Sequence, residues 1–95
     1  MVHRLTERAE VMSVSRELQV VASPVVGTFH AAPPQPNASP FVAVGQSVRE
    51  GDTLCIVEAQ GLMNEIPAER AGVIAERLVD HGAPVEYGQP LFTIK

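Results

Sequence analysis

The sequence is short of lysine and of cysteine, and both shortages exclude particular kinds of chemistry. Lys95, the last residue, is the only lysine, and the other six of the seven basic residues are arginines. Cys55 is the only cysteine, so neither an intrachain disulfide nor a cysteine-based metal site can form. Because Cys55 lies within TLCIV, the pattern of a buried strand, we expect a core thiol rather than a nucleophile.

Long apolar runs are also missing. No run approaches the roughly 20 residues of a membrane span, and the N-terminal region carries charges throughout instead of the apolar stretch of a signal peptide. The net charge of −4 and the scattered arginines argue against a nucleic-acid or anionic-membrane surface. We therefore expect a cytoplasmic protein without nucleic-acid or membrane partners, and we assign no metal site.

The residue composition and the spacing of apolar residues change near Gln19. Residues 1–18 hold no Gly or Pro and place Leu5, Ala9 and Met12 at helical spacing, which fits either a short helix or a flexible leader. This leader begins with Met1 and does not look trimmed. From residue 19 to 95, short aliphatic runs are broken by Gly and Pro, as is typical of an all-β sandwich or barrel. Residues 31–40, AAPPQPNASP, must form a proline-stiffened loop, with Asn37 in an Asx-type turn.

The β-rich part contains an internal repeat. Residues 45–57 and 82–94 share the pattern G-x-x-V-x-x-G-x-x-L-x-x-[VI]. The match extends backward to Gly27 and Gly72 if the first copy carries an eight-residue insertion, which falls in the Pro-rich loop. Such a repeat predicts a pseudo-symmetric β structure whose glycines lie in turns that need positive φ.

The joint between the two copies reads VEAQGLMNEI, residues 57–66. Two extended segments flank Gln60-Gly61, and an X-Gly pair in that setting predicts a β-hairpin with a primed turn, because glycine accepts the positive φ. We therefore place Gly61 at an exposed hairpin tip on the pseudo-two-fold axis.

From about residue 19 onward, the chain resembles the biotinyl domain of the biotin carboxyl carrier protein of bacterial acetyl-CoA carboxylase. SPVVGTF (23–29), VGQSVREGDTLCIVEA (44–59), MNEI (63–66) and GAPVEYGQPLFTIK (82–95) follow that family in order. The Pro-rich segment 30–41 resembles the family's thumb loop. The resemblance implies a flattened β-barrel or sandwich of two four-stranded antiparallel sheets with pseudo-two-fold symmetry. It also implies a central hairpin whose tip carries biotin on a lysine within an E-A-M-K-M motif.

The chain departs from that motif at its centre. Glu58 and Ala59 are kept, but Gln60, Gly61 and Leu62 stand where the resemblance places Met, Lys and Met, and Met63 follows. Biotin or lipoyl attachment needs a primary amine on a long stem, and no lysine precedes Lys95. The sequence therefore predicts a domain that is not a covalent carrier and holds no cofactor. Because three adjacent positions differ, we favour natural divergence over an engineered loss.

His30 and Gln60 are the candidate catalytic residues. His30 follows the VGTF strand and opens the Pro-rich loop, where it could face the hairpin tip, and an imidazole suits proton transfer near neutral pH. A single histidine beside a loop is more often a surface or hydrogen-bonded residue, so both interpretations stay open. Glu58 and Glu65 flank the hairpin as an acid–base pair or, more commonly, as solvated turn residues. The remaining histidines, His3 and His81, are expected on the surface without partners.

Several functions remain open. The domain is repurposed in fatty-acid, polyketide-type or other specialised metabolism, either as an adaptor or decoy that docks on carboxylase subunits or as a small enzyme. The enzyme would bind a polyketide-like molecule between residues 31–41 and 59–64 and catalyse a cyclisation or decarboxylation. A third interpretation is a carboxylase carrier altered at its attachment site. The sequence does not decide between these functions, nor does it give an oligomeric state.

Overall fold

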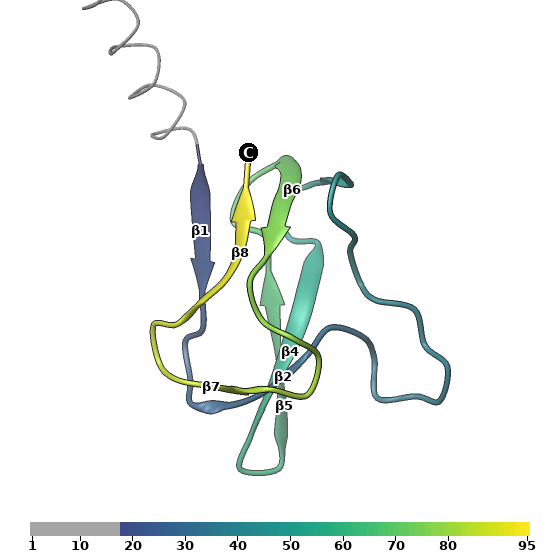
Figure 1. The fold of residues 1–95 in the computed structure, drawn as a ribbon, viewed down its shortest axis with the longest axis vertical. Coiled ribbons are helices and arrows are strands. Elements are labelled where there is room, and N and C mark those ends of the chain that lie inside the picture. Colours follow the sequence, from purple (N-terminus) through teal and green to yellow (C-terminus); the bar gives the residue numbers. More distant parts are fainter. Residues whose placement is uncertain (1–17) are drawn as a thin grey trace, which may run out of the picture.

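Two four-stranded antiparallel sheets make up the part of the chain that the computed structural model describes, residues 18–95. The strands are β1 (Gln19–Ala22), β2 (Gly27–His30), β3 (Ser47–Val48), β4 (Thr53–Ala59), β5 (Leu62–Pro67), β6 (Gly72–Arg77), β7 (Pro84–Val85) and β8 (Pro90–Ile94). One sheet has the order β1-β8-β6-β3 and the other β5-β4-β2-β7 (Figure 1). The predicted all-β fold is confirmed. No helix capable of spanning a membrane occurs in residues 18–95. The expected leader, residues 1–18, lies outside this range except for Leu18, and His3 also lies outside it.

The sequence repeat corresponds to a two-fold relation between the sheets. β3 and β7 occupy equivalent positions in the two strand orders, as do β4 and β8, and each pair is offset by 37 residues. The hydrogen bonds repeat as well. Gly45 N donates to Ile74 O at 2.8 Å, and Gly82 N donates to Phe29 O at 2.7 Å. The predicted pseudo-symmetry is therefore confirmed at the level of strand order and of individual backbone contacts.

The glycines of the repeat meet two different requirements. Four of them have φ between 81° and 90°, as predicted for turns; these are Gly45, Gly51, Gly82 and Gly88. The prediction is wrong for Gly27 and Gly72, which are not among the residues with positive φ. A Cβ on Gly27 would overlap the backbone carbonyl of Glu58, and one on Gly72 would overlap the side chain of Ile94. These two positions need glycine because a neighbouring strand passes too close for a side chain.

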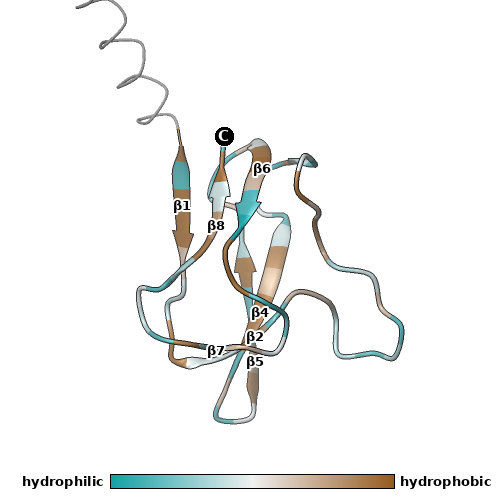
Figure 2. Cartoon of the chain, viewed as in Figure 1, coloured by the Kyte–Doolittle hydropathy of each residue, from teal (hydrophilic) through white to brown (hydrophobic). Residues whose placement is uncertain are grey.

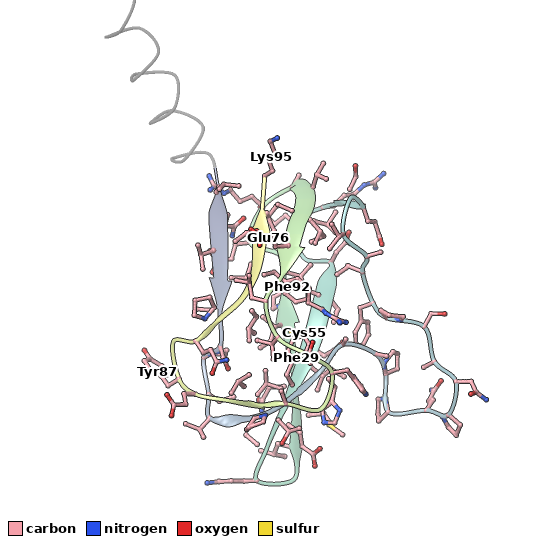
Figure 3. All side chains as sticks on the ribbon, in the orientation of Figure 1. Phe29, Cys55, Glu76, Tyr87, Phe92 and Lys95 are labelled. Carbon is pink, nitrogen blue, oxygen red and sulfur yellow. The ribbon has the colours of Figure 1, made fainter. Side chains whose placement is uncertain are left out.

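The core lies between the sheets and includes residues from both halves of the repeat. Apolar residues make up most of β1 and β4 (Figure 2). Phe29 and Phe92 are almost completely buried, and their ring centroids lie 5.9 Å apart in a tilted arrangement (Figure 3). Cys55 is fully buried beside them, and burial raises the pKa of its thiol to about 12. The expectation of a core thiol is therefore confirmed, and its burial disfavours the reactive thiolate.

The Pro-rich loop joins β2 to β3 and extends away from both sheets (Figure 1). Its base is closed by a hydrogen bond from Phe41 N to Ala31 O at 2.9 Å, and Phe41 packs against the core. Asn37 has φ of 61°, and Ala38 N donates to Gln35 O at 3.3 Å, so the outer part of the loop makes a turn closed by the backbone rather than by the Asn37 side chain of the expected Asx-type turn. The loop is thus fixed at its base and projects at its tip.

Candidate functional site

The hairpin of β4 and β5 extends beyond the rest of the two sheets (Figure 1). Its last pair is Ala59 with Leu62, and the two residues between them have φ of 53° at Gln60 and 79° at Gly61. Two consecutive left-handed residues are the signature of a type I′ turn, so the predicted primed turn is confirmed. Gly61 is exposed, and a Cβ added there would meet no atom within 4 Å. The tip therefore has room for a long side chain but offers none.

Lys95 does not compensate for this absence. It follows β8 at the end of the molecule opposite the hairpin tip (Figure 3). The pseudo-symmetry explains its place, because β8 is the counterpart of β4 and the C-terminus is therefore the counterpart of the hairpin end. Since Lys95 is the only lysine in the chain, the hairpin tip has no lysine amine within reach.

His30 is bound to the side of the hairpin rather than to its tip. Its Nε2 lies 3.0 Å from Oε1 of Glu58, in an ion-pair geometry, and the two side chains are 22% and 41% exposed. In the strand register, His30 lies opposite Ile56 and Thr28 lies opposite Glu58. The hairpin and the strand that leads into the Pro-rich loop are thus joined by side chains as well as by the backbone.

His81 contacts the segment around His30, which the sequence alone does not indicate. Ala31 N donates to His81 Nδ1 at 3.0 Å, and the His81 ring meets the His30 ring edge-on, with centroids 5.6 Å apart and planes at 71°. The expected exposure of His81 is correct, but the expectation that it has no partner is wrong. His81 lies next to Gly82, whose amide donates to Phe29 O. This bond brings His81 close to His30, but it can be inferred only once the strand order is known.

The structure does not bring the candidates His30 and Gln60 together. His30 lies opposite Ile56, which precedes Gln60 by four residues, or about 13 Å along an extended strand. Glu58 and Glu65 do not form a pair either, because Glu65 Oε1 accepts a hydrogen bond from Thr53 Oγ1 at 3.2 Å while Glu58 binds His30. Two polar sites result, one at the tip and one at the base of the Pro-rich loop.

A hollow of about 350 Å³ lies beside the hairpin tip, lined by Val25, Val26, Ala59, Gln60, Leu62 and Asn64. It uses the predicted segment 59–64, but its opposite wall is Val25 and Val26 rather than the Pro-rich loop. Leu62 is 68% exposed and starts β5 directly after the polar turn (Figure 2). A second hollow of about 360 Å³ takes in Pro40 at the end of the Pro-rich loop, together with Val42 and Arg77. No cluster of three metal-binding side chains occurs within residues 18–95.

Comparison with known proteins identifies related chains. The sequence profile of the family described as "Biotin-requiring enzyme" matches residues 19–94. The chain is 52% identical over 82 residues to the biotin carboxyl carrier protein of acetyl-CoA carboxylase from Nostoc sp., covering 86% of this chain and 44% of that protein. It is 59% identical over 75 residues to the Pseudomonas aeruginosa protein of the same name, covering 79% and 47%. The chain thus spans less than half the length of these relatives.

Solved structures of carboxylases contain the same fold. Kluyveromyces lactis urea carboxylase superposes with a TM-score of 0.69 at 26% identity, covering 83% of this chain and 6% of that one. A single-chain, multi-domain long-chain acyl-CoA carboxylase superposes with a TM-score of 0.65 at 22% identity, covering 80% and 7%, a likeness of fold alone.

Proposed function

Because the chain belongs to the biotin-requiring enzyme family through residues 19–94, we propose that it is a biotin carboxyl carrier protein-like domain that carries no biotin. In this proposal the domain functions in fatty-acid, polyketide-type or other specialised metabolism in the cytoplasm. The observation that carries this proposal is the hairpin tip, which keeps the turn of a carrier hairpin but has Gly61 at its end.

The chemistry of attachment gives the physical reason. Biotin is joined to a carrier by an amide bond, which forms when a primary amine attacks an activated carboxyl carbon. Gly61 has no side chain, and a backbone amide nitrogen is not a usable nucleophile because its lone pair is delocalised into the carbonyl. The residues at the tip therefore do not fit covalently bound biotin, and the same reasoning applies to lipoate.

Intact-mass analysis tests this proposal. The chain is co-expressed with a biotin ligase in excess biotin and compared with two variants made in the same way, Gly61→Lys and the triple change Gln60→Met, Gly61→Lys and Leu62→Met. The triple variant restores the E-A-M-K-M motif of the family. We expect an adduct of one biotinyl group on the triple variant and none on the unmodified chain. A biotinyl adduct on the unmodified chain would overturn the proposal.

Docking on carboxylase subunits is the non-catalytic form of this function. The curated relatives are named as carriers of acetyl-CoA carboxylase, and the hairpin of this chain exposes Leu62 and Met63, at 68% and 45%. An adaptor or decoy would use these apolar side chains as contacts. Titration with the biotin carboxylase subunit of acetyl-CoA carboxylase measures the affinity. The double change Leu62→Ser and Met63→Ser should weaken binding, whereas Tyr87→Ser, a change at a second exposed residue on another loop, should not.

A small enzyme is the second candidate, and the contact between His30, Glu58 and His81 favours it specifically. Such a cluster offers proton-transfer groups that an adaptor has no need of. The substrate would be a small molecule of polyketide type, undergoing cyclisation or decarboxylation. Genes for carboxylase subunits beside this gene would favour the adaptor, and a biosynthetic cluster would favour the enzyme.

A further inference from the structure

We propose that His30 and His81 form a base and an electrophile at the base of the Pro-rich loop and enolise an acyl thioester or ketone. This inference rests on the enzymatic form of the proposed function and names its site and substrate class. It is based on three contacts that join β2, β4 and the segment before β7.

The hydrogen bond from Ala31 fixes the tautomer of His81. A backbone N–H can only donate, so His81 Nδ1, at 3.0 Å, must present a lone pair. The proton of the neutral ring is then on Nε2. Because the side chain is exposed, this Nε2–H group is available as a hydrogen-bond donor to a bound molecule.

Glu58 fixes the same tautomer at His30 but leaves the lone pair, rather than the N–H group, unbound. A carboxylate only accepts hydrogen bonds, so the Nε2 of His30, 3.0 Å from Glu58 Oε1, carries a proton. In the neutral ring the lone pair is then on Nδ1, which is the base. When Nδ1 accepts a proton, the carboxylate of Glu58 stabilises the resulting imidazolium. Within residues 18–95, neither His30 Nδ1 nor His81 Nε2 has a hydrogen-bond partner, so both remain available for a substrate.

The two rings lie in contact at the base of the Pro-rich loop, and in the proposed step they act on one carbonyl group. Their centroids lie 5.6 Å apart with the planes at 71°, so one ring edge faces the other ring. His30 Nδ1 removes a proton from the carbon next to the carbonyl, and the electron pair of the broken C–H bond forms a C=C bond. The π electrons of the carbonyl move to its oxygen, which accepts a hydrogen bond from His81 Nε2–H without taking its proton. A neutral imidazole can stabilise an enolate in this way. Return of the proton from His30 completes the cycle, so no oxidant or further reactant is needed.

Two isosteric variants separate this chemistry from a structural role. In His81→Asn, the side-chain oxygen can still accept from Ala31 N, and in His30→Gln the side-chain nitrogen can still donate to Glu58. Both variants should fold like the unmodified chain by circular dichroism, yet each lacks one of the two reactive nitrogens. Glu58 is a positioning residue in this scheme, because it acts through His30.

The test uses the N-acetylcysteamine thioester of a 3-oxoacyl chain and follows deuterium entry at its C2 carbon in D₂O by NMR. We expect the unmodified chain to accelerate exchange over buffer, His30→Gln to return it to the buffer rate, and His81→Asn to slow the protein-dependent rate by about 100-fold. Long-range ¹H–¹⁵N spectra should show the Nε2–H tautomer for both rings. Exchange at the buffer rate, equal rates in all three proteins, or an Nδ1–H tautomer at His81 would overturn the inference. A failure of the proposed function itself would be seen separately, as a biotin adduct on the unmodified chain in the mass measurement.

Discussion

Placing a lysine at the hairpin tip is the change that most directly tests the proposal that Gly61 prevents the attachment of biotin. In Gly61→Lys, the new side chain meets no atom within 4 Å, so no steric cost arises from neighbours. The backbone conformation does impose a cost, because φ at this position is 79°. An L-residue with a side chain is less stable than glycine in that region by about 1 kcal/mol.

The size of this cost decides whether the experiment is informative. A domain of this size is stable by about 4–12 kcal/mol, at roughly 0.05–0.15 kcal/mol per residue. A loss of about 1 kcal/mol therefore leaves the variant folded, with a melting temperature lower by about 4–8 °C. The Gly61→Lys variant should thus be a folded protein with an amine at its tip, and any failure to accept biotin cannot be attributed to unfolding.

The assay combines thermal unfolding with intact mass after co-expression with a biotin ligase. Gly61→Arg is the matched control, since it introduces a long cationic side chain with the same backbone strain but no primary amine. Both variants should lose similar stability, and only the lysine variant should gain biotin. Unchanged melting temperatures in both would refute the argument from φ. A folded lysine variant without biotin, alone and in the restored motif, would show that the tip is not equivalent to the family's attachment position.

Three further changes test other parts of the structure. Burial raises the pKa of Cys55 from an ordinary value of about 9 to about 12, so the folded chain keeps a proton that the unfolded chain loses. The contribution of the protonated thiol to the free energy of unfolding is complete below about pH 9 and is lost as the pH rises toward 12. Urea unfolding at pH 10.5 should therefore show about 2 kcal/mol of alkaline destabilisation that Cys55→Ala lacks. Gly27→Ala should destabilise the fold by more than about 2 kcal/mol in the same assay, because its Cβ overlaps the carbonyl of Glu58, whereas Gly45→Ala, with open space around it, should cost only about 1 kcal/mol. His81→Leu should speed hydrogen exchange at the Ala31 amide, whereas His81→Asn should not, because only the asparagine can accept that hydrogen bond.

The parts of the fold that follow from local sequence signals could be predicted. The Gln60-Gly61 pair between two apolar runs indicates a primed turn because few residues tolerate positive φ. The spacing of the repeat indicates two equivalent halves, and the hydrogen bonds of Gly45 and Gly82 show that equivalence directly. The repeat also predicts the equivalence of Gly27 and Gly72, but it does not indicate why they are glycines, since the sequence does not reveal how closely a neighbouring strand passes.

The site was harder to predict because it depends on contacts between distant segments. His30 and His81 are separated by 51 positions and meet because β7 pairs with β2. No spacing rule for a single strand or loop indicates that meeting. The sequence predicts that Gln60 and His30 both lie near the Pro-rich loop. The antiparallel register instead places His30 beside Ile56, four residues from the turn.

Gln60 has a backbone conformation that the folding of the hairpin alone does not favour for glutamine. At φ of 53°, this glutamine lies in a backbone region that asparagine, aspartate and glycine tolerate better, so its side chain carries a conformational cost. Gly61 next to it has no such cost, and neither residue has a neighbour that requires its presence for packing, since both are exposed. Stability alone would favour glycine or asparagine at both positions of the turn. The glutamine at the strained position lines the hollow together with Leu62 and Asn64, so the hairpin bears a conformational cost there that no packing contact offsets.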